Sequence, residues 1–320
     1  EFRWDARGTA TQPTRERTEA MLYVEPIYRP PSEAGSLLIQ ATIGCASAAQ
    51  GHCYFCGSWL IDRQIPQKKF RVRPARDVMK DLDEARGQTG PAVRRIFLLD
   101  SNAMIMRAGQ LEMISRHAYR LFPSLERVSV YACANDILRK SDEDLKRIRE
   151  AGISLLYVGL ESGSEAILEL HNKGVTAEDT VRACSRAMEA GFEISITVIL
   201  GLGGRKQSLL HARDTGSILS RIQPNYLGAL TLMVVPGLPV EDWISRGEFE
   251  LLTQEEIIDE LEEMLGCIET DREIVFRTNH ASNYLPLGGV LPQDKERMLK
   301  VIHEARAQKV PLRPEHLRGL

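Results

Sequence analysis

The chain has 320 residues, 43% of them hydrophobic, which is enough to bury a full core in one large α/β domain or two smaller ones. Its formal net charge of -3 gives no general attraction to phosphate backbones and so disfavours nucleic-acid binding. No apolar run approaches the roughly 20 residues that span a bilayer. The polar start also lacks the apolar core of a signal peptide. We therefore expect no membrane span and a cytoplasmic protein.

Residues 1–34 are predicted to form an irregular arm, since Pro26, Pro30 and Pro31 remove hydrogen-bond donors and favour an extended path. An apolar run of strand length follows in residues 37–43 and ends at Gly44. The first strand therefore leads directly into the next segment, which holds half of the chain's cysteines.

Three of the six cysteines, Cys45, Cys53 and Cys56, lie in this one loop. Thiolates held close together need a compensating cation or a bond. One possibility is a zinc site completed by His52, although no second ligand pair is visible. Another is a disulfide with one thiol left over, which suits short secreted chains better. The third is an iron–sulfur cluster held by three cysteines, which leaves one iron open for a ligand.

The loop resembles that of the radical S-adenosylmethionine (AdoMet) superfamily, in which an aromatic residue precedes the last cysteine, as Phe55 does here. The resemblance extends over residues 23–307 and includes the segments IYRPPSEAGSLLIQATIGC, FRVRPARDV, YVGLESGSE, VILGLGG and FRTNHASNYLPL. The spacing departs from the usual C-x3-C-x2-C, because seven residues separate Cys45 from Cys53. These residues are small, and we expect them to bulge outward.

This resemblance implies a [4Fe-4S] cluster held by the three cysteines, with AdoMet as second cofactor and an electron donor such as flavodoxin or ferredoxin. It implies reductive cleavage of AdoMet to a 5′-deoxyadenosyl radical, which removes hydrogen from a substrate. Because the chain is slightly acidic, we expect a small organic or cofactor-like substrate. The enzyme would then be an oxidoreductase or a transferase. The alternatives are a non-catalytic iron–sulfur or zinc-binding module and an RNA-modifying radical AdoMet enzyme.

Strand and helix periodicities alternate through the rest of the chain. Strands are predicted at residues 94–100, 128–133, 154–161, 194–200 and 226–235, and helices near residues 74–86, 108–121, 141–150, 177–190, 208–222, 254–265 and 293–308. Such alternation predicts parallel strands with right-handed crossovers. The family resemblance implies that the six strands curve into a parallel partial (β/α)6 barrel. We expect this barrel in residues 35–240 and a C-terminal extension in residues 241–320 that closes it.

Loops at the carboxyl ends of parallel strands converge on one face, so residues there are candidate ligands. Asp100 and Asn102 follow the second strand and offer acceptors for the AdoMet amino group, although Asp-Ser-Asn also makes an ordinary turn. Glu161 and Ser162 follow the fourth strand, where the resemblance implies AdoMet contact. Ser162 could instead cap a helix. Lys173 lies where related enzymes use a cation for the AdoMet carboxylate, and it could equally be a solvated surface lysine.

The segment VILGLGG follows the fifth strand and contains Leu200 and Gly201, which the resemblance places along the AdoMet adenine. Its glycines alone could also indicate a phosphate-binding turn, but no full G-x-G-x-x-G and no Walker lysine is present.

Two further sets of residues are candidates for the chemistry. His280 and Tyr284, in the polar segment 274–287, can donate a proton or hydrogen atom, although the segment could simply be a strand and a self-bonded loop. Cys133 ends the third strand on the expected active face and is a candidate substrate-facing thiol. Cys184 and Cys267 are expected in the core.

Overall fold

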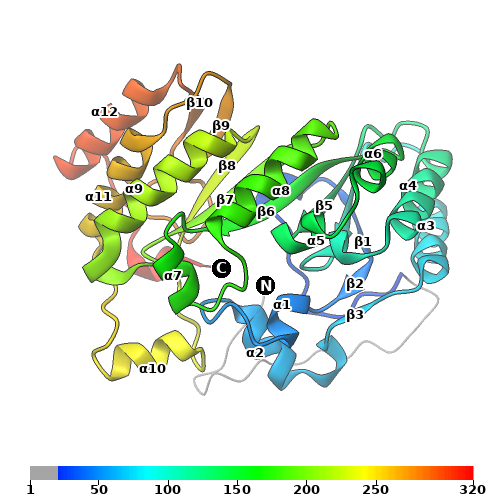
Figure 1. Ribbon diagram of the computed structural model, residues 1–320, viewed down its shortest axis with the longest axis horizontal. Helices are drawn as coiled ribbons and strands as arrows, with labels where there is room; N and C mark the ends of the chain where they lie inside the picture. Colours follow the sequence, from blue (N-terminus) through cyan, green and yellow to red (C-terminus); the bar gives the residue numbers. More distant parts are fainter. Residues whose placement is uncertain (1–20, 320) are drawn as a thin grey trace. The chain divides into compact units, whose positions relative to one another are not determined.

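The computed structural model describes residues 21–319, so residues 1–20 of the expected arm lie outside the described part of the chain. Strands and helices alternate along the described chain (Figure 1). The main sheet has eight strands: β1 (Leu37–Gln40), β4 (Arg95–Leu99), β5 (Arg127–Ala132), β6 (Ile153–Glu161), β7 (Glu193–Leu200), β8 (Tyr226–Thr231), β9 (Ile274–Arg277) and β10 (Gly288–Leu291). The predicted α/β alternation is confirmed, and the C-terminal residues add two strands to the six expected.

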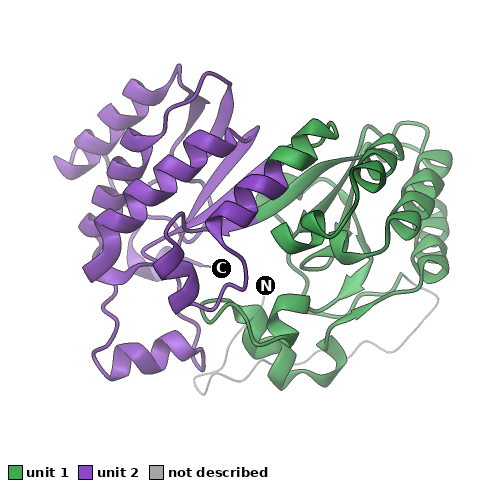
Figure 2. Ribbon diagram, in the orientation of Figure 1, with its two compact units in different colours: residues 1–158, 185–193 green, residues 159–184, 194–320 purple. Residues whose placement is uncertain are grey.

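Contacts between Cα atoms divide the chain into two compact units (Figure 2). The first unit contains residues 1–158 and 185–193, and the second contains residues 159–184 and 194–320. Helix α8 (Ala177–Glu189) and strand β6 contribute residues to both. The expected division into an arm, a barrel and a C-terminal extension stays a prediction.

In the first unit, the strand order is β1-β4-β5-β6, and neighbouring strands pair in parallel. A short antiparallel pair, β2 (Thr42–Ile43) with β3 (Arg71–Val72), lies beside the loop that follows β1. The helices are α1 (Ala46–Ala49), α2 (Gly57–Gln64), α3 (Ala75–Thr89), α4 (Ala108–Leu121), α5 (Ala134–Leu138) and α6 (Asp142–Glu150). Helices α3 and α4 pack against each other.

The end of the arm is anchored in this unit by Glu33, whose side chain is fully buried. Its Oε1 accepts hydrogen bonds from Arg127 at 2.7 Å, from the Tyr157 hydroxyl at 2.7 Å and from Ser129 at 3.0 Å. A buried carboxylate needs such donors, because desolvation would otherwise disfavour it strongly. The chain therefore enters β1 from a fixed point against β5 and β6.

In the second unit, β7, β8 and β9 are parallel neighbours and β10 pairs antiparallel with β9. The helices are α7 (Glu165–Leu170), α9 (Gly204–Ile222), α10 (Pro239–Ser245), α11 (Gln254–Cys267) and α12 (Lys295–Arg306). Helices α9 and α11 lie side by side and make the densest helix contact of the unit (Figure 1). Gly216 allows this approach, because a Cβ there would lie 2.5 Å from the Cβ of Cys267.

Two predicted boundaries differ from the structure by four residues. Helix α9 begins at Gly204, four residues before the expected start at residue 208, because the Gly-Gly pair forms its first turn. Strand β8 ends at Thr231 rather than at residue 235, where the backbone leaves the ladder for the loop before α10. Within residues 21–319, no helix combines the length and apolar character needed to cross a membrane.

Candidate functional site

The cysteine loop follows β1 and the two-residue strand β2. Gly44 has φ +70°, and a Cβ at this position would lie 2.2 Å from the carbonyl oxygen of Lys68, so only glycine fits here. Cys45 and Cys56 are the N-cap residues of α1 and α2, and Cys53 adopts φ +65°. All six cysteines of the chain are reduced, and the three in this loop are half-buried.

The expectation that the seven residues between Cys45 and Cys53 bulge outward holds only in part. Residues Ala46–Ala49 form the single helical turn α1, which contacts α2, and Ala46 and Ala48 are buried, whereas Ala49 and Gln50 are exposed. Small apolar side chains allow one face of this turn to pack inside. The longer spacing is therefore taken up by a helical turn with one buried face.

Two other thiols lie close enough to Cys45 to affect its ionisation. Burial, with a smaller effect from Cys56 and Cys133, raises the pKa of Cys45 to about 11, although backbone hydrogen bonds in α1 oppose the shift. Cys133, the N-cap of α5 at the end of β5, therefore faces the same region as the loop. Among residues 21–319, no three His, Cys, Asp or Glu side chains are gathered closely enough to hold a metal ion as they stand.

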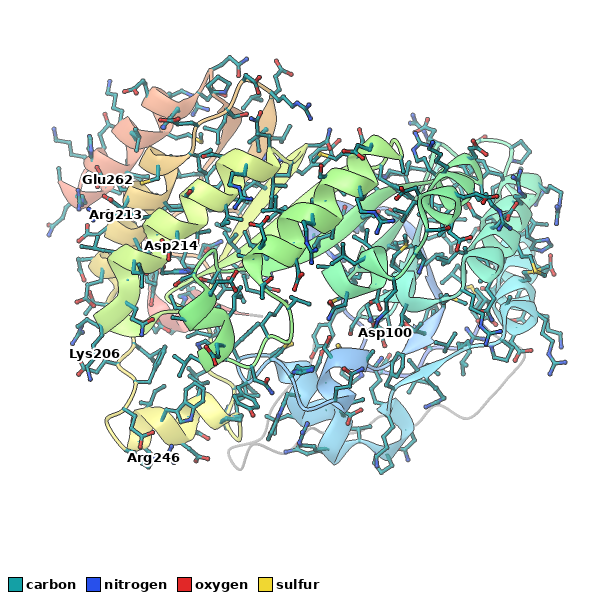
Figure 3. The ribbon with its side chains drawn as sticks, viewed as in Figure 1. Asp100, Lys206, Arg213, Asp214, Arg246 and Glu262 are labelled. Carbon is teal, nitrogen blue, oxygen red and sulfur yellow. The ribbon has the colours of Figure 1, made fainter. Side chains whose placement is uncertain are left out.

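Asp100, labelled in Figure 3, follows β4 and is buried, with 1% of its surface exposed. Its Oδ2 forms an ion pair with Lys68 and accepts hydrogen bonds from the N–H of Gly44 at 3.1 Å and from Gln40 at 3.3 Å. Burial raises the pKa of Asp100 and lowers that of Lys68, while their attraction opposes both shifts. Tyr28, Gly44, Cys45, Lys68 and Asp100 line part of a small cavity at this point.

Two buried acceptor oxygens on this turn lack a hydrogen-bond partner among the described residues: Oδ1 of Asp100 and Oδ1 of Asn102. The amide nitrogen of Asn102 donates to Asp136 at 2.8 Å, which fixes the orientation of its amide. Buried acceptors are rarely left unsatisfied in folded proteins, so each is an open position for a donor. An ammonium group carries three donors, so its chemistry suits acceptors of this kind.

In the second unit, Glu161 ends β6 with φ +66° and pairs with Lys173, whose Nζ lies 2.9 Å from Oε1 of Glu161. Gly159 makes room for this pair, since a Cβ there would lie 2.0 Å from the same oxygen. Lys173 is therefore not a solvated surface lysine, because only 11% of its side chain is exposed.

Ser162, fully buried, forms a hydrogen bond of 2.8 Å with Nδ1 of His211, and its oxygen accepts the N–H of Ser164 at 3.1 Å. Gly163 lies against the backbone of α9, where a Cβ would be 2.3 Å from the carbonyl oxygen of Asp214. The Ser162 hydroxyl is thus engaged within the protein.

Leu200 is the buried last residue of β7, and Gly201 follows with φ +81°. The N–H of Gly201 donates to Oε1 of Glu260, on α11, at 2.6 Å. The backbone of this turn is therefore held by a side chain 59 residues further along the chain.

These features agree with a family model. The model for the Radical SAM superfamily matches residues 39–214, more than half of the chain. The chain belongs to the radical AdoMet superfamily. As expected from the sequence, membership in this superfamily implies a [4Fe-4S] cluster and AdoMet as cofactors.

The radical AdoMet chain is also similar to two curated proteins. It is 24% identical over 180 residues to the heme chaperone HemW of Bacillus subtilis, covering 56% of this chain and 47% of that protein. It is 25% identical over 219 residues to an uncharacterised protein of Methanocaldococcus jannaschii, covering 68% of this chain and 66% of that one. The chain thus spans about half of the first relative and just under two thirds of the second.

Among solved structures, the fold is similar to that of the radical AdoMet methyltransferase TsrM from Kitasatospora setae, with cobalamin and a [4Fe-4S] cluster bound. The TM-score is 0.53 at 17% identity, covering 71% of this chain and 44% of that one. This likeness concerns the fold and agrees with the predicted partial barrel.

The remaining candidates of this radical AdoMet chain lie in the C-terminal part. The hydroxyl of Tyr284 donates to Glu315 at 2.5 Å, and the guanidinium of Arg318 lies 4.2 Å from the ring centre. Burial and the bond to Glu315 raise the pKa of Tyr284 to about 12. His280 contacts Ser282 through Nδ1 at 2.9 Å, and burial lowers its pKa. Both candidates therefore have partners within their own loop and the C-terminal segment.

Sequence reasoning missed Lys68, His211 and Glu260. Lys68 follows no periodic pattern that would have placed it in the core. Glu260 did carry a signal, because it shares a helical face with Ile257 and Met264, both buried. An acidic residue on the apolar face of a covering helix indicates a buried partner.

Proposed function

We propose that this chain cleaves AdoMet reductively at a [4Fe-4S] cluster and thereby removes a hydrogen atom from a small organic or cofactor-like substrate. The observation that supports it best is the presence of a three-thiol loop after β1 and, after β4, of two acceptor oxygens that have no partner within residues 21–319. When bound, the cluster and AdoMet supply the one-electron chemistry. The chain's own residues hold, orient and shield these groups.

Cys45, Cys53 and Cys56 would hold the cluster. Three soft thiolate donors from one loop, with no fourth beside them in sequence, suit a cluster that keeps one iron for another ligand. Cys56 is the N-cap residue of α2, where the helix dipole stabilises negative charge. The donor set therefore fits the cofactor.

Asp100 and Asn102 would receive the amino group of AdoMet through their unpartnered Oδ1 atoms. The other oxygen of Asp100 is occupied by Lys68 and by the N–H of Gly44, so the same carboxylate would orient AdoMet and brace the cysteine loop. Such a shared contact ties the position of AdoMet to that of the first cluster ligand.

The family resemblance implies further AdoMet contacts: the carboxylate of Glu161, the Ser162 segment, the cation of Lys173 and the backbone of Leu200 and Gly201. Phe55, before the last cysteine, is proposed to shield the bound cofactor, and it is buried in the structure.

Cys133, His280 and Tyr284 are proposed as donors to the substrate. Cys133 is the best supported of the three by position, because its charge acts on Cys45. An electron donor of the flavodoxin or ferredoxin class is proposed to reduce the cluster. The net charge of -3 favours a small molecule over RNA as substrate.

The decisive experiment is anaerobic reconstitution of the purified chain with iron and sulfide. We expect about four iron and four sulfide per chain, and 5′-deoxyadenosine from AdoMet only when dithionite is added. A variant with all three loop cysteines changed to alanine is the matched control and should give neither. Bound zinc, or iron without AdoMet cleavage, would instead support the non-catalytic alternative.

The substrate class needs a second experiment. Candidate small molecules labelled with deuterium are incubated with enzyme, reductant and AdoMet, and deuterium in 5′-deoxyadenosine is measured by mass spectrometry. Haem belongs in the panel because one relative is a heme chaperone. Deuterium transfer from a labelled RNA, with none from small molecules, would favour the RNA-modifying alternative.

A further inference from the structure

Glu260 is a fully buried carboxyl group on the inner face of α11. Ile257, Leu261 and Met264 are buried on the same face of the helix. Among the described residues, the groups within hydrogen-bonding distance of Glu260 are neutral, and no arginine or lysine compensates it. A buried carboxyl without a cation costs folding free energy that a leucine in its place would not.

Both carboxyl oxygens of Glu260 accept hydrogen bonds from one short segment of the chain. Oε1 accepts the N–H of Gly201 at 2.6 Å, and Oε2 lies 2.6 Å from the hydroxyl of Ser208. Gly201 is the first residue after β7, and Ser208 lies in the second turn of α9. The carboxyl group of Glu260 therefore holds both ends of the turn that joins β7 to α9.

His211 extends this network to a second strand end. Its Nε2 lies 2.9 Å from the carbonyl oxygen of Ile199, which can only accept, so Nε2 carries the proton. Burial lowers the pKa of His211 to about 4, so the ring is neutral near pH 7 and Nδ1 accepts from Ser162. The contact of Nε2 with Glu260, at 3.6 Å, is therefore not an ion pair.

The buried network thus holds Gly201 and Ser162, one residue from each of the two strand ends assigned to AdoMet. The side chains on the outer faces of α9 and α11 differ from this buried network, because they form exposed ion pairs. Arg213 on α9 pairs with Glu263 on α11 at 2.6 Å, with 63% of the arginine side chain exposed, so the outer faces are held by surface ion pairs (Figure 3).

We propose that Glu260 is a positioning residue that fixes the backbone N–H of Gly201, and with it the turn that contacts AdoMet, while His211 fixes Ser162. This inference rests on the function proposed above. It explains why a carboxyl group occupies a place in the core where an apolar side chain would be less costly: the benefit is a fixed backbone at a binding turn.

The test compares Glu260→Gln with Glu260→Leu. Glutamine can accept the N–H of Gly201 through its oxygen and donate to Ser208 through its amide, whereas leucine can do neither. Glu262→Leu is the matched control on the same helix, because Glu262 faces His303 and Arg306 instead (Figure 3). Each reconstituted variant is measured for AdoMet dissociation constant by equilibrium dialysis, and each apo variant for hydrogen exchange at Gly201.

We expect Glu260→Leu to weaken AdoMet binding by about tenfold and to speed hydrogen exchange at Gly201, without lowering the apo melting temperature. Glu260→Gln should stay within about threefold of the unmodified chain in affinity, because its hydrogen bonds persist. Glu262→Leu should leave affinity and exchange unchanged.

The inference is overturned if Glu260→Leu keeps the AdoMet affinity and the slow exchange at Gly201. It is also overturned if Glu260→Gln loses as much AdoMet affinity as Glu260→Leu and exchanges as fast at Gly201. If Glu260→Leu does not fold, Glu260→Ala, which also removes the acceptor of the Gly201 N–H, takes its place beside Glu260→Gln, with fast exchange at Gly201 expected only in Glu260→Ala. An unmodified chain that neither binds nor cleaves AdoMet would refute the proposed function. Hydrogen exchange at Gly201 in the apo chain would still test whether Glu260 fixes this backbone N–H.

Discussion

The carboxylate of Asp100 accepts a hydrogen bond from the backbone N–H of Gly44 at 3.1 Å, and Gly44 directly precedes the first cysteine of the loop. The same oxygen forms a buried ion pair with Lys68. Because both side chains are at most 2% exposed, neither can be satisfied by water if the other is removed. The start of the cysteine loop is therefore fixed to the end of β4 by a charged pair in the core.

We expect Lys68→Met to destabilise the apo protein by about 3 kcal/mol, because it leaves an uncompensated buried carboxylate. The double variant Lys68→Met, Asp100→Asn should lose less than Lys68→Met alone, since both charges are then gone. Urea denaturation followed by circular dichroism measures both. If the double variant were less stable than either single variant, the ion pair would not explain the loss.

We expect replacement of any one loop cysteine to reduce the iron content. Cys53→Ala and Cys56→Ala should each retain well under half of the iron bound by the unmodified chain after reconstitution, because two thiolates hold a cluster poorly. Cys267→Ser, which changes a half-buried thiol outside the loop, is the control and should retain full iron. Equal loss in this control would indicate general instability.

We expect Lys173→Met to raise the AdoMet dissociation constant by about tenfold, because a charge-assisted contact contributes about 1.5 kcal/mol or more. Lys206→Met, which removes an exposed lysine of α9, is the control (Figure 3). Both affinities are measured by equilibrium dialysis on reconstituted protein. Unchanged binding in Lys173→Met would limit its role to the ion pair with Glu161.

Burial raises the pKa of Glu260 to about 7, above its ordinary value of 4.5. The folded chain therefore holds this proton more tightly than the unfolded chain, so its contribution to stability is complete below pH 4.5 and is lost as the pH rises to about 7. Glu260→Gln lacks this titration. Its free energy of unfolding, relative to the unmodified chain, should thus increase by about 2 kcal/mol between pH 5 and pH 8.

Urea denaturation at several pH values measures that difference. His211 is the titratable group that faces Glu260 among the described residues, and it is present in both proteins, so its own titration cancels in the comparison. A difference that is constant from pH 5 to pH 8 would show that Glu260 has an ordinary pKa.

We expect Tyr284→Phe to loosen the C-terminal segment, because it removes the hydroxyl that bonds Glu315. Limited proteolysis should cut after Arg313 or Arg318 faster than in the unmodified chain. A proteolysis rate that does not change, combined with lost 5′-deoxyadenosine formation, would instead assign Tyr284 to the chemistry.

The sequence by itself determined the family, the cofactors and the order of strands and helices. Cys45, Cys53 and Cys56 lie within one loop, and alternating periodicity identifies parallel strands, so each of these signals is local along the chain. Asp100 and Asn102 are candidates for the same reason, because they follow a strand that the pattern locates.

Only the tertiary structure decided which side chains hold those elements in place. Lys68 and Asp100 are 32 residues apart, and Gly201 and Glu260 are 59 apart. The burial of α1 between Cys45 and Cys53 likewise depended on packing against α2. Periodicity reports which face of an element is apolar, whereas the choice of partner for a buried charge depends on which faces meet when the chain folds.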